Sequence, residues 1–447
     1  MKKILVDTQL SNYDTYGTFV LEADSGWQMC MGRIRELLKL NPDLSIDILG
    51  PNVSTHRAFD HGQVITHPFN INPDIWGTYG PSGNCRLQYV EHEVIPNALA
   101  TRYDFNWKSL NRTLSLNQHR NGSEPKYDAV YVNDPMRFRA LKALFHVAGG
   151  YSPKFFVHSH FIDDPACPKF PVEASLWLGQ VEAAIRADWN FWQCQNSLDT
   201  FEREMRKQFL PHVVDDVLRK SSPWDDGYSM EEINSPVNMH NVRFDIAKLR
   251  RAVDGKMVIF VPNRIGGRGR SSDYTNCGKF MFDILPEIRK RRNDFVVIAG
   301  NPSQKFLNSE LQTECGENGY VSLVPDALNR DEYRFIVKEF VDLVVSLYDQ
   351  DTYGGTASRE CIDLGCVPLW LDNYEYTSIA KEAKCDDFVL ARTDFSDIVD
   401  VADRLMTMII NEDPSIELAS SRLQNVVRKR CSYESSTVAA AKLMGLI

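Results

Sequence analysis

One stretch of the chain, 348–360, combines a turn of small residues with a carboxylate at a set spacing. Gly354, Gly355 and Thr356 stand where we expect a helix to begin, and free backbone amides at such a point can hold an anion such as a diphosphate. Glu360 follows within the first turns of that helix, so its carboxylate can reach a ribose diol. The spacing predicts a nucleotide-diphosphate site, although a plain strand–turn–helix with a solvated glutamate explains it equally simply.

A second group consists of His158, His160 and Asp163, which follow a predicted strand. A His-x-His pair near an aspartate is typical of the start of a zinc or iron site in a metallohydrolase. That site needs further histidines after later strands, and the candidates there are His212 and His240. Polar residues that only hydrogen-bond one another are the simpler interpretation.

The elements that must position these residues follow from short apolar runs separated by helical patterns. Several runs are apolar at every residue, as expected for parallel strands covered on both faces. Between 27 and 40, apolar residues recur at helical spacing. The predicted strands are 3–7, 45–49, 63–66, 129–133, 155–158, 190–194, 257–261, 295–299, 321–324, 343–347, 367–371 and 388–390. The alternation predicts an α/β protein with two doubly wound, Rossmann-like domains.

The domain boundaries follow from where strand character fails. We expect an N-terminal domain over 1–220, a linker over 221–255 and a C-terminal domain over 256–425. The remaining segment, 426–447, is expected to form a helix that packs back on the N-terminal domain. An irregular insertion at about 68–125, rich in Asn, Pro, Gly and aromatic residues, is a candidate for recognition of an acceptor.

Composition excludes some classes of function. Sixty acidic and fifty basic residues give the 447-residue chain a net charge of −10, which offers no general attraction for nucleic acid or an anionic membrane. The ten cysteines include no Cys-x-x-Cys pair, which argues against a zinc ribbon or finger. No apolar stretch approaches the roughly 20 residues of a membrane span, and the first apolar run is too short for a signal peptide. We therefore expect a cytoplasmic protein without a membrane span.

The stretch around Glu360 resembles the signature of GT-B glycosyltransferases, especially the large retaining family four. In that signature, Glu-Gly-Phe-Gly is followed after four residues by a second glutamate and later by Gly-x-Pro. Gly355 matches the signature glycine, Glu360 matches the second glutamate, and Gly365-Cys366-Val367-Pro368 is similar to the closing motif. The resemblance implies two facing doubly wound domains, of which the C-terminal one holds a nucleotide-sugar donor.

The signature departs from the family at Thr352, which stands in place of the first glutamate. In the family this glutamate contacts the donor sugar, so the sugar and the retaining or inverting outcome stay open. Asp349 and Asp351 are the alternative carboxylates if the loop is shifted by a few residues.

A further match runs from the strand 257–261 to Gly300. In the family, this unit carries an arginine and a lysine that neutralise the donor diphosphate. Arg264 falls in the family's arginine position. Lys279, Arg268 and Arg270 compete for the lysine position, because 266–275 resembles an insertion. Cations suit this place because stabilising the charge of the departing diphosphate is most of the catalytic task.

The N-terminal half resembles the family mainly in topology. Gly26, before a predicted helix, is similar to the small-residue loop that approaches the diphosphate in this superfamily. The resemblance implies that a histidine in this region, His158 or His160, lies near the transferred sugar, and that a carboxylate such as Asp163 helps to position or deprotonate the acceptor hydroxyl.

The resemblance implies transfer of a hexose from a UDP- or GDP-sugar to a hydroxyl of a carbohydrate or glycoconjugate, without a metal or other cofactor. One alternative is a phage-type DNA glycosyltransferase acting on hydroxymethylated bases, for which the basic clusters 289–292 and 428–430 are the candidate contacts. A nucleotide-sugar epimerase, a metallohydrolase and a non-enzymatic nucleotide-binding module are alternatives of other classes.

Overall fold

The computed structural model divides into two compact units, which we describe separately: Met1–Asp226 with Ser436–Ile447, the N-terminal unit, and Gly227–Ser435, the C-terminal unit. The described residues are 2–8, 25–51, 64–69, 87–90, 93–96, 114, 116, 126–133, 135–160, 173–265, 280–302, 320–321, 328–347, 356–371, 374–391 and 395–447.

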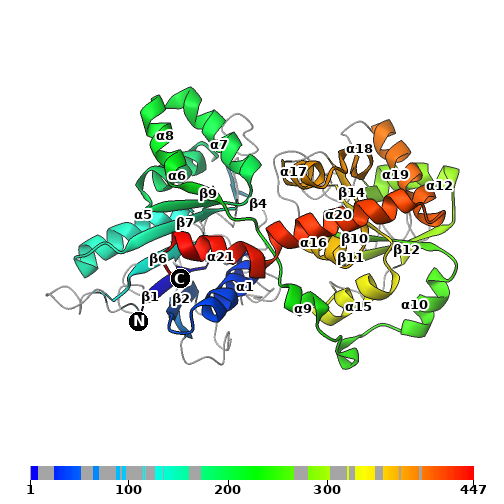
Figure 1. Cartoon of the computed structure of the whole chain (residues 1–447), viewed down its shortest axis with the longest axis horizontal. Coiled ribbons are helices and arrows are strands. Elements are labelled where there is room, and N and C mark those ends of the chain that lie inside the picture. Colours follow the sequence, from blue (N-terminus) through cyan, green and yellow to red (C-terminus); the bar gives the residue numbers. More distant parts are fainter. Residues whose placement is uncertain are drawn as a thin grey trace. The chain divides into compact units, whose positions relative to one another are not determined.

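The N-terminal unit is built on a sheet of seven strands, all paired in parallel, in the order β3-β2-β1-β6-β7-β8-β9. Several of these strands, such as β1, β6 and β7, are labelled in Figure 1. The strands are β1 (Lys3–Asp7), β2 (Ser45–Pro51), β3 (Val64–Phe69), β6 (Ala129–Val132), β7 (Lys154–Ser159), β8 (Trp189–Trp192) and β9 (Ser221–Pro223). The chain reverses its direction of progress across the sheet between β1 and β6. Ligands of open parallel sheets bind at the carboxyl ends of the strands beside such a switch point.

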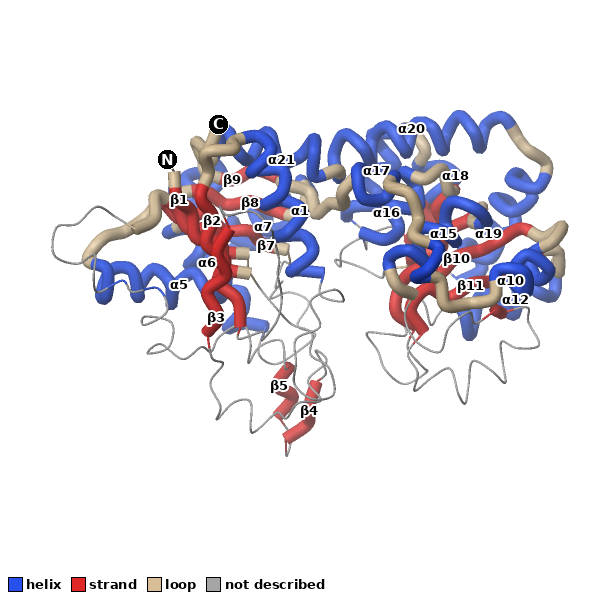
Figure 2. The backbone as a smooth tube through the Cα atoms, turned by 90° about the horizontal axis from the view of Figure 1, so that it is seen from below, coloured by secondary structure: helices blue, strands red, loops and turns tan. Residues whose placement is uncertain are grey.

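Helices cover both faces of this sheet (Figure 2). Successive side chains of β1 point to opposite faces, so Ile4 and Val6 pack against α1 while Leu5 packs against α5. The helices are α1 (Ser25–Leu40), α5 (Pro135–Leu144), η3 (Phe145–Gly149), α6 (Glu173–Arg186), α7 (Gln195–Gln208) and α8 (Pro211–Arg219). Ala440 and Met444, from the end of the chain, join the core on the α1 face.

The C-terminal unit repeats the plan with six parallel strands in the order β12-β11-β10-β13-β14-β15. The strands are β10 (Met257–Ile265), β11 (Phe295–Pro302), β12 (Tyr320–Val321), β13 (Leu343–Ser346), β14 (Val367–Leu371) and β15 (Leu390–Ala391). Its switch point lies between β10 and β13. Ile259 packs against α12 and α19, whereas Val258 and Phe260 pack against α10 and α15.

The helices of this unit fall into two sets. One set precedes or accompanies the sheet: α9 (Met230–Asn234), η4 (Met239–Asn241), α10 (Ile246–Val253), η6 (Phe280–Ile284), α12 (Leu285–Arg291) and α15 (Arg330–Phe340). The other follows β13: α16 (Thr356–Asp363), α17 (Tyr374–Ala383), α18 (Asp386–Val389), α19 (Phe395–Ile410) and α20 (Pro414–Cys431). The final helix α21 (Tyr433–Leu443) crosses the boundary between the units. Among the described residues, no helix is both long and apolar enough to span a membrane.

At two positions of the sequence motifs the structure explains why the residue is glycine. A side chain at Gly300, at the end of β11, would come within 2.7 Å of the Phe260 ring. Gly365 has φ +100°, a conformation that other residues rarely adopt, and it turns the chain from α16 into β14.

The predicted α/β class with two doubly wound domains is confirmed. The expected linker over 221–255, however, begins with a strand and contains helices. Ser221–Pro223 has no apolar residue, yet it extends the sheet through backbone bonds such as Trp224 N–H to Trp192 O at 2.7 Å. An edge strand tolerates polar residues and proline, so hydrophobic patterning does not reveal it.

The prediction of a strand over 388–390 was partly wrong. The first residues belong to the short helix α18, where the Val389 N–H donates to Cys385 O at 3.2 Å, and the strand begins only at Leu390. A buried apolar run of this length looks the same in a helix and a strand. In the insertion at about 68–125, Leu87–Val90 (β4) and Glu93–Pro96 (β5) form an antiparallel hairpin.

Candidate functional site

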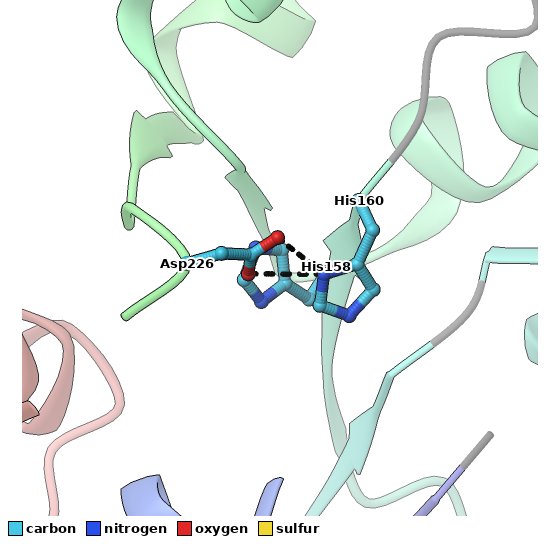
Figure 3. Close-up of side chains that lie close together, drawn as sticks. All are labelled: His158, His160 and Asp226. Carbon is cyan, nitrogen blue, oxygen red and sulfur yellow. Dashed lines mark hydrogen bonds and ion pairs between the residues drawn. The ribbon is translucent and has the colours of Figure 1, made fainter. Parts of the chain in front are cut away.

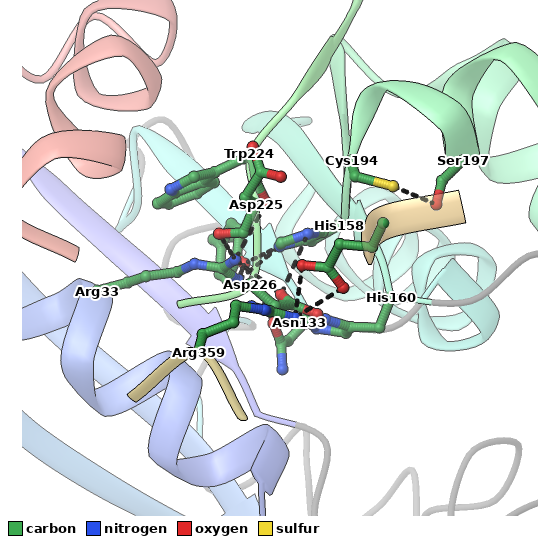
Figure 4. A network of polar contacts seen from close by, with 12 residues as sticks. Arg33, Asn133, His158, His160, Cys194, Ser197, Trp224, Asp225, Asp226 and Arg359 are labelled. Atoms are coloured by element: carbon green, nitrogen blue, oxygen red, sulfur yellow. Dashed lines mark hydrogen bonds and ion pairs between the residues drawn. The ribbon is translucent and has the colours of Figure 1, made fainter. Parts of the chain in front are cut away.

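Polar side chains gather at the carboxyl edge of the N-terminal sheet (Figure 4). Asn133 follows β6, His158 and His160 lie at the end of β7, and Asp226 follows β9. Arg33 reaches them from α1, and all five are at most 5% exposed. We call these five residues the arginine–histidine cluster. It lies at the edge of the sheet where a ligand of this fold class is expected.

His160 is held through both ring nitrogens, and Figure 3 shows its contact with Asp226. Its Nδ1 lies 3.0 Å from each carboxylate oxygen of Asp226, and its Nε2 lies 2.8 Å from Oδ1 of Asn133. A carboxylate behind an imidazole fixes the orientation of the ring and the identity of its protonated nitrogen. The Nε2 edge is therefore presented in one direction.

Arg33 supplies the positive charge of the cluster. It donates to Asp226 Oδ1 at 2.9 Å and to His158 Nδ1 at 2.6 Å. Its guanidinium also stacks 4.3 Å above the ring of Trp224, a favourable cation–π arrangement. A buried carboxylate without a cationic partner is strongly destabilising, so Arg33 offsets the free-energy cost of burying Asp226.

His158 is an acceptor rather than an acid in this network. Its Nδ1 receives a hydrogen bond from Arg33 and also lies 2.9 Å from the Tyr131 hydroxyl oxygen, so the ring proton sits on Nε2. Burial, together with the nearby Arg33 and His160, holds the pKa of His158 well below its usual value. Its Nε2 forms no hydrogen bond with any described residue. The ring stays neutral and is stacked between His160 and Trp224.

The cluster has the composition of a metal site but not the geometry of one. Ligand atoms of His158, His160 and Asp226 lie within 4.8 Å of one another. The two imidazoles, however, are stacked 4.3 Å apart with planes only 28° from parallel, so their in-plane lone pairs do not converge on one ion. Arg33 already neutralises Asp226. The geometry favours a hydrogen-bonded network over the zinc or iron centre considered from the sequence.

The C-terminal unit places a second charged pair at the carboxyl edge of its sheet. In a parallel sheet the helices begin at that edge, so the first residue of α15, Arg330, and the first turns of α16 share it. Arg330 binds Glu360 through both terminal nitrogens, at 2.7 and 2.6 Å, and Glu232 through Nε at 2.6 Å. Burial opposes the charge, but these carboxylates hold the pKa of Arg330 well above its usual value.

The structure brings some of the predicted site residues together, places others singly on helices and strands, and does not describe the rest. His158 and His160 are brought together, and Glu360 lies on α16, whose first residue is Thr356. Gly26 is the second residue of α1, and Arg264 is near the end of β10, opposite Asn301. The predicted residues that lie outside the described part of the chain are Asp163, Arg268, Arg270, Lys279, Thr352, Gly354 and Gly355.

The sequence interpretation missed Arg33, Asn133, Asp226 and Arg330. Two of them carried a usable signal. Arg33 lies three residues after Cys30 and four before Leu37, on the apolar face of its helix, which is an unusual place for a charge. Asn133 directly follows a buried strand. Asp226 and Arg330 reach their partners only through tertiary structure.

Comparison with known proteins identifies the architecture. No family model matches the chain, and no curated protein matches it in sequence. Among solved structures, HepE from Anabaena in complex with UDP matches with a TM-score of 0.62 at 13% identity over 100% of both chains. Sucrose-phosphate synthase from Thermosynechococcus elongatus matches with 0.63 at 10% identity, over 100% of this chain and 98% of that one. The chain has the GT-B fold.

A third GT-B structure supports the same assignment. The α,α-trehalose-phosphate synthase (UDP-forming) from Burkholderia xenovorans, in complex with glucose-6-phosphate, matches with a TM-score of 0.66 at 12% identity over 100% of both chains. The resemblance inferred from the motif around Glu360 is confirmed at the level of the GT-B fold. Identities this low carry no residue roles from those proteins to this one.

Proposed function

We propose that this chain is a glycosyltransferase that moves a hexose from a UDP- or GDP-sugar to a hydroxyl acceptor. The observation that carries the proposal is the position of Glu360, a carboxylate one turn inside the helix that follows β13 at the switch point of the C-terminal sheet. A ribose diol bound there leaves its diphosphate near the start of α16, where backbone amides favour an anion. The full-length likeness to HepE with bound UDP supports the same donor class.

The diphosphate would be held by side chains and amides of the chain itself. Arg264 and Lys279, or Arg268 and Arg270 in place of the lysine, are the proposed cations, and the amides of 354–356 assist them. Side chains of this kind stabilise a leaving diphosphate without a divalent metal. The proposed reaction therefore uses the nucleotide sugar as a co-substrate and no further cofactor.

In the N-terminal unit, we assign contact with the reacting sugars to His160. His160 is 5% exposed, whereas His158 is fully buried. Asp226 binds Nδ1 of His160, so Nε2 of this ring points away from the Asp226 carboxylate. A sugar hydroxyl can take the place of the Asn133 amide oxygen as partner of Nε2. His158 then acts by holding Arg33, and Asp163 and the insertion at about 68–125 remain the candidates for acceptor binding.

The proposed acceptor is a carbohydrate or glycoconjugate rather than DNA. In the cluster 289–292, Lys290 pairs with Glu287, Arg291 with Asp400 and Arg292 with Asp294. In the cluster 428–430, each basic side chain also meets a carboxylate: Arg428 pairs with Asp363, and Lys429 and Arg430 pair with Glu382. Basic residues already neutralised by neighbours contribute little to a phosphate-binding surface. A steep salt dependence of DNA binding would favour the DNA glycosyltransferase instead.

The cysteines bear on the compartment. The described cysteines, 30, 194, 361, 366, 385 and 431, are all buried free thiols. Free thiols persist in reducing compartments. We therefore propose that the protein works in the cytoplasm.

The decisive experiment is a panel of UDP-, GDP-, TDP- and ADP-sugars, assayed for slow hydrolysis by the full chain and for thermal stabilisation by the matching nucleoside diphosphates. We expect one nucleotide series to stabilise the protein and its sugar to be released, and Glu360→Gln to weaken both effects. Binding without turnover would favour a nucleotide-binding module, and conversion of the sugar without release would favour an epimerase. No response to any nucleotide, with stoichiometric zinc or iron by elemental analysis, would favour a metallohydrolase.

A further inference from the structure

Arg330 and Glu360 form a clamp with two parallel hydrogen bonds. Nη1 donates to Oε2 at 2.7 Å and Nη2 donates to Oε1 at 2.6 Å. A fork-to-fork arrangement of this kind fixes both the position of a carboxylate and its rotation about the last side-chain bond. The plane of the Glu360 carboxylate is therefore determined by Arg330.

The clamp leaves Glu360 with unused capacity. A carboxylate offers about four lone pairs, and Arg330 uses one on each oxygen. Within the described part of the chain, no other group donates a hydrogen bond to this carboxylate. Two acceptor positions, one on each oxygen, remain for two donors on one ligand, and a vicinal diol supplies two hydroxyls at neighbouring carbons.

Arg330 is itself held from several sides. Its Nε donates to Glu232 at 2.6 Å, and its guanidinium lies 5.5 Å from the centre of the Tyr333 ring. Arg330 is the first residue of α15, and Asn329 and Glu332 cap that helix reciprocally. These contacts reduce the freedom that the long arginine side chain would otherwise have, so the clamp does not depend on a bound ligand for its order.

We propose that Arg330 is a positioning residue of the donor site, which orients Glu360 so that its two oxygens accept from both hydroxyls of one ribose and thereby select ribonucleotide over deoxyribonucleotide donors. This inference rests on the proposed function. Arg330 does not touch the donor; it acts through the carboxylate. Without the clamp the carboxylate rotates, and only one of the two ribose hydroxyls is accepted at a time.

The C-terminal unit offers a matched control. Arg243 clamps Glu332 in the same manner, with Nε to Oε1 at 2.9 Å and Nη2 to Oε2 at 2.8 Å. The two arginines are similarly exposed, at 44% for Arg243 and 40% for Arg330. Glu332 caps α15 and is not proposed to meet the donor. It keeps the backbone N–H groups of Asn329 and Arg243 in Arg243→Gln, so this change removes an equivalent clamp while the cap of α15 is retained.

The test measures the affinity of the full chain for UDP and 2′-deoxy-UDP by calorimetry, with the guanine pair used if the wild type prefers GDP. A hydroxyl that donates to a charged acceptor contributes enough for wild type to bind the ribonucleotide about tenfold more tightly or better. We expect this ratio to fall to about twofold in Arg330→Gln and to be unchanged in Arg243→Gln. Arg330→Lys keeps the charge without the fork, so it should also lose most of the ratio.

The outcomes separate the two proposals. Failure of the wild type to bind any nucleoside diphosphate ends the proposed function and this inference with it. Binding with an equal ratio in wild type and both Arg330 variants ends this inference alone, because Arg330 then only supports the fold. The Arg330→Lys variant keeps the decision possible if Arg330→Gln is too unstable to measure.

Discussion

The two sheets share one plan but treat their charged pairs differently. Each sheet reverses its strand order at a switch point, and each places an arginine–carboxylate pair at its carboxyl edge. In the N-terminal unit the pair is closed: the side chains of Arg33 and Asp226 are 2% and 5% exposed. In the C-terminal unit it is half open, with Arg330 40% exposed above a Glu360 that is 6% exposed.

The difference indicates which pair serves the structure and which can serve a ligand. All the charge of a closed pair is used by protein partners, so its loss leaves a charge in a medium that cannot solvate it. A half-open pair loses less when broken, because water replaces the missing partner. Mutations should therefore affect mainly stability in the first region and mainly donor binding in the second.

The largest effect is expected from Asp226→Ala. This change leaves the Arg33 guanidinium buried without its carboxylate, and removal of one partner of a buried pair typically lowers the free energy of unfolding by about 3–5 kcal/mol. Urea unfolding of the full chain, with hydrogen exchange of peptides from β6 and β7, measures the loss in the N-terminal unit.

The double variant Arg33→Met with Asp226→Leu is the control for that prediction. It removes both charges and fills the space, so it should cost much less than the two single changes together. A loss below about 1 kcal/mol in Asp226→Ala would mean that water reaches Arg33, and the contrast between the two regions would disappear.

The second effect tests whether the closed region also contributes to activity. We expect His160→Ala to lower kcat roughly 10–100-fold, because the hydrogen bond between Nε2 and a sugar hydroxyl is lost. Asp226 keeps Arg33 as its partner, so the folded state survives. His160→Gln, which restores a hydrogen-bonding amide near the same place, should recover part of the rate. An unchanged kcat in both variants would make the whole cluster structural.

The third effect is a dependence of stability on pH that comes from His158. An unfolded histidine takes up a proton below about pH 6.5, whereas buried His158, facing Arg33 and His160, does so only at much lower pH. The unfolded state then binds more protons, so stability falls as the pH drops below about 6.5, by at most about 1.4 kcal/mol per pH unit. Thermal unfolding between pH 7.5 and 5 measures this slope. His158→Asn should flatten it, and an equal slope in that variant would assign it to other groups.

The sequence predicted the sheets better than it predicted the charged networks, for a physical reason. Strands such as β1 and β13 each contain three consecutive apolar residues, and the burial of such runs can be inferred from the sequence alone. The pairing of Arg33 with Asp226 joins residues 193 positions apart, and that of Arg330 with Glu360 joins residues 30 apart. Nothing in the local pattern specifies these partners, because they meet only when the strands reach a common edge.

The smallest effect is expected from Arg243→Gln. This change measures the stability lost when a half-exposed arginine–glutamate clamp with no proposed ligand is broken. We expect the free energy of unfolding to fall by only about 0.5–1 kcal/mol, because Glu332 keeps the backbone N–H groups of Asn329 and Arg243, at 2.9 and 2.8 Å. Burial raises the pKa of Glu332, but the hydrogen bonds from the Arg243 side chain, followed by those from the two backbone N–H groups, outweigh it and hold the pKa below its usual value. The contribution is therefore present at neutral pH and is lost as the pH falls through that lowered pKa. Urea unfolding at pH 7 and pH 3 measures both parts. A loss above about 2 kcal/mol at pH 7 would show that half-exposed clamps are structural here, and the same conclusion would then extend to Arg330.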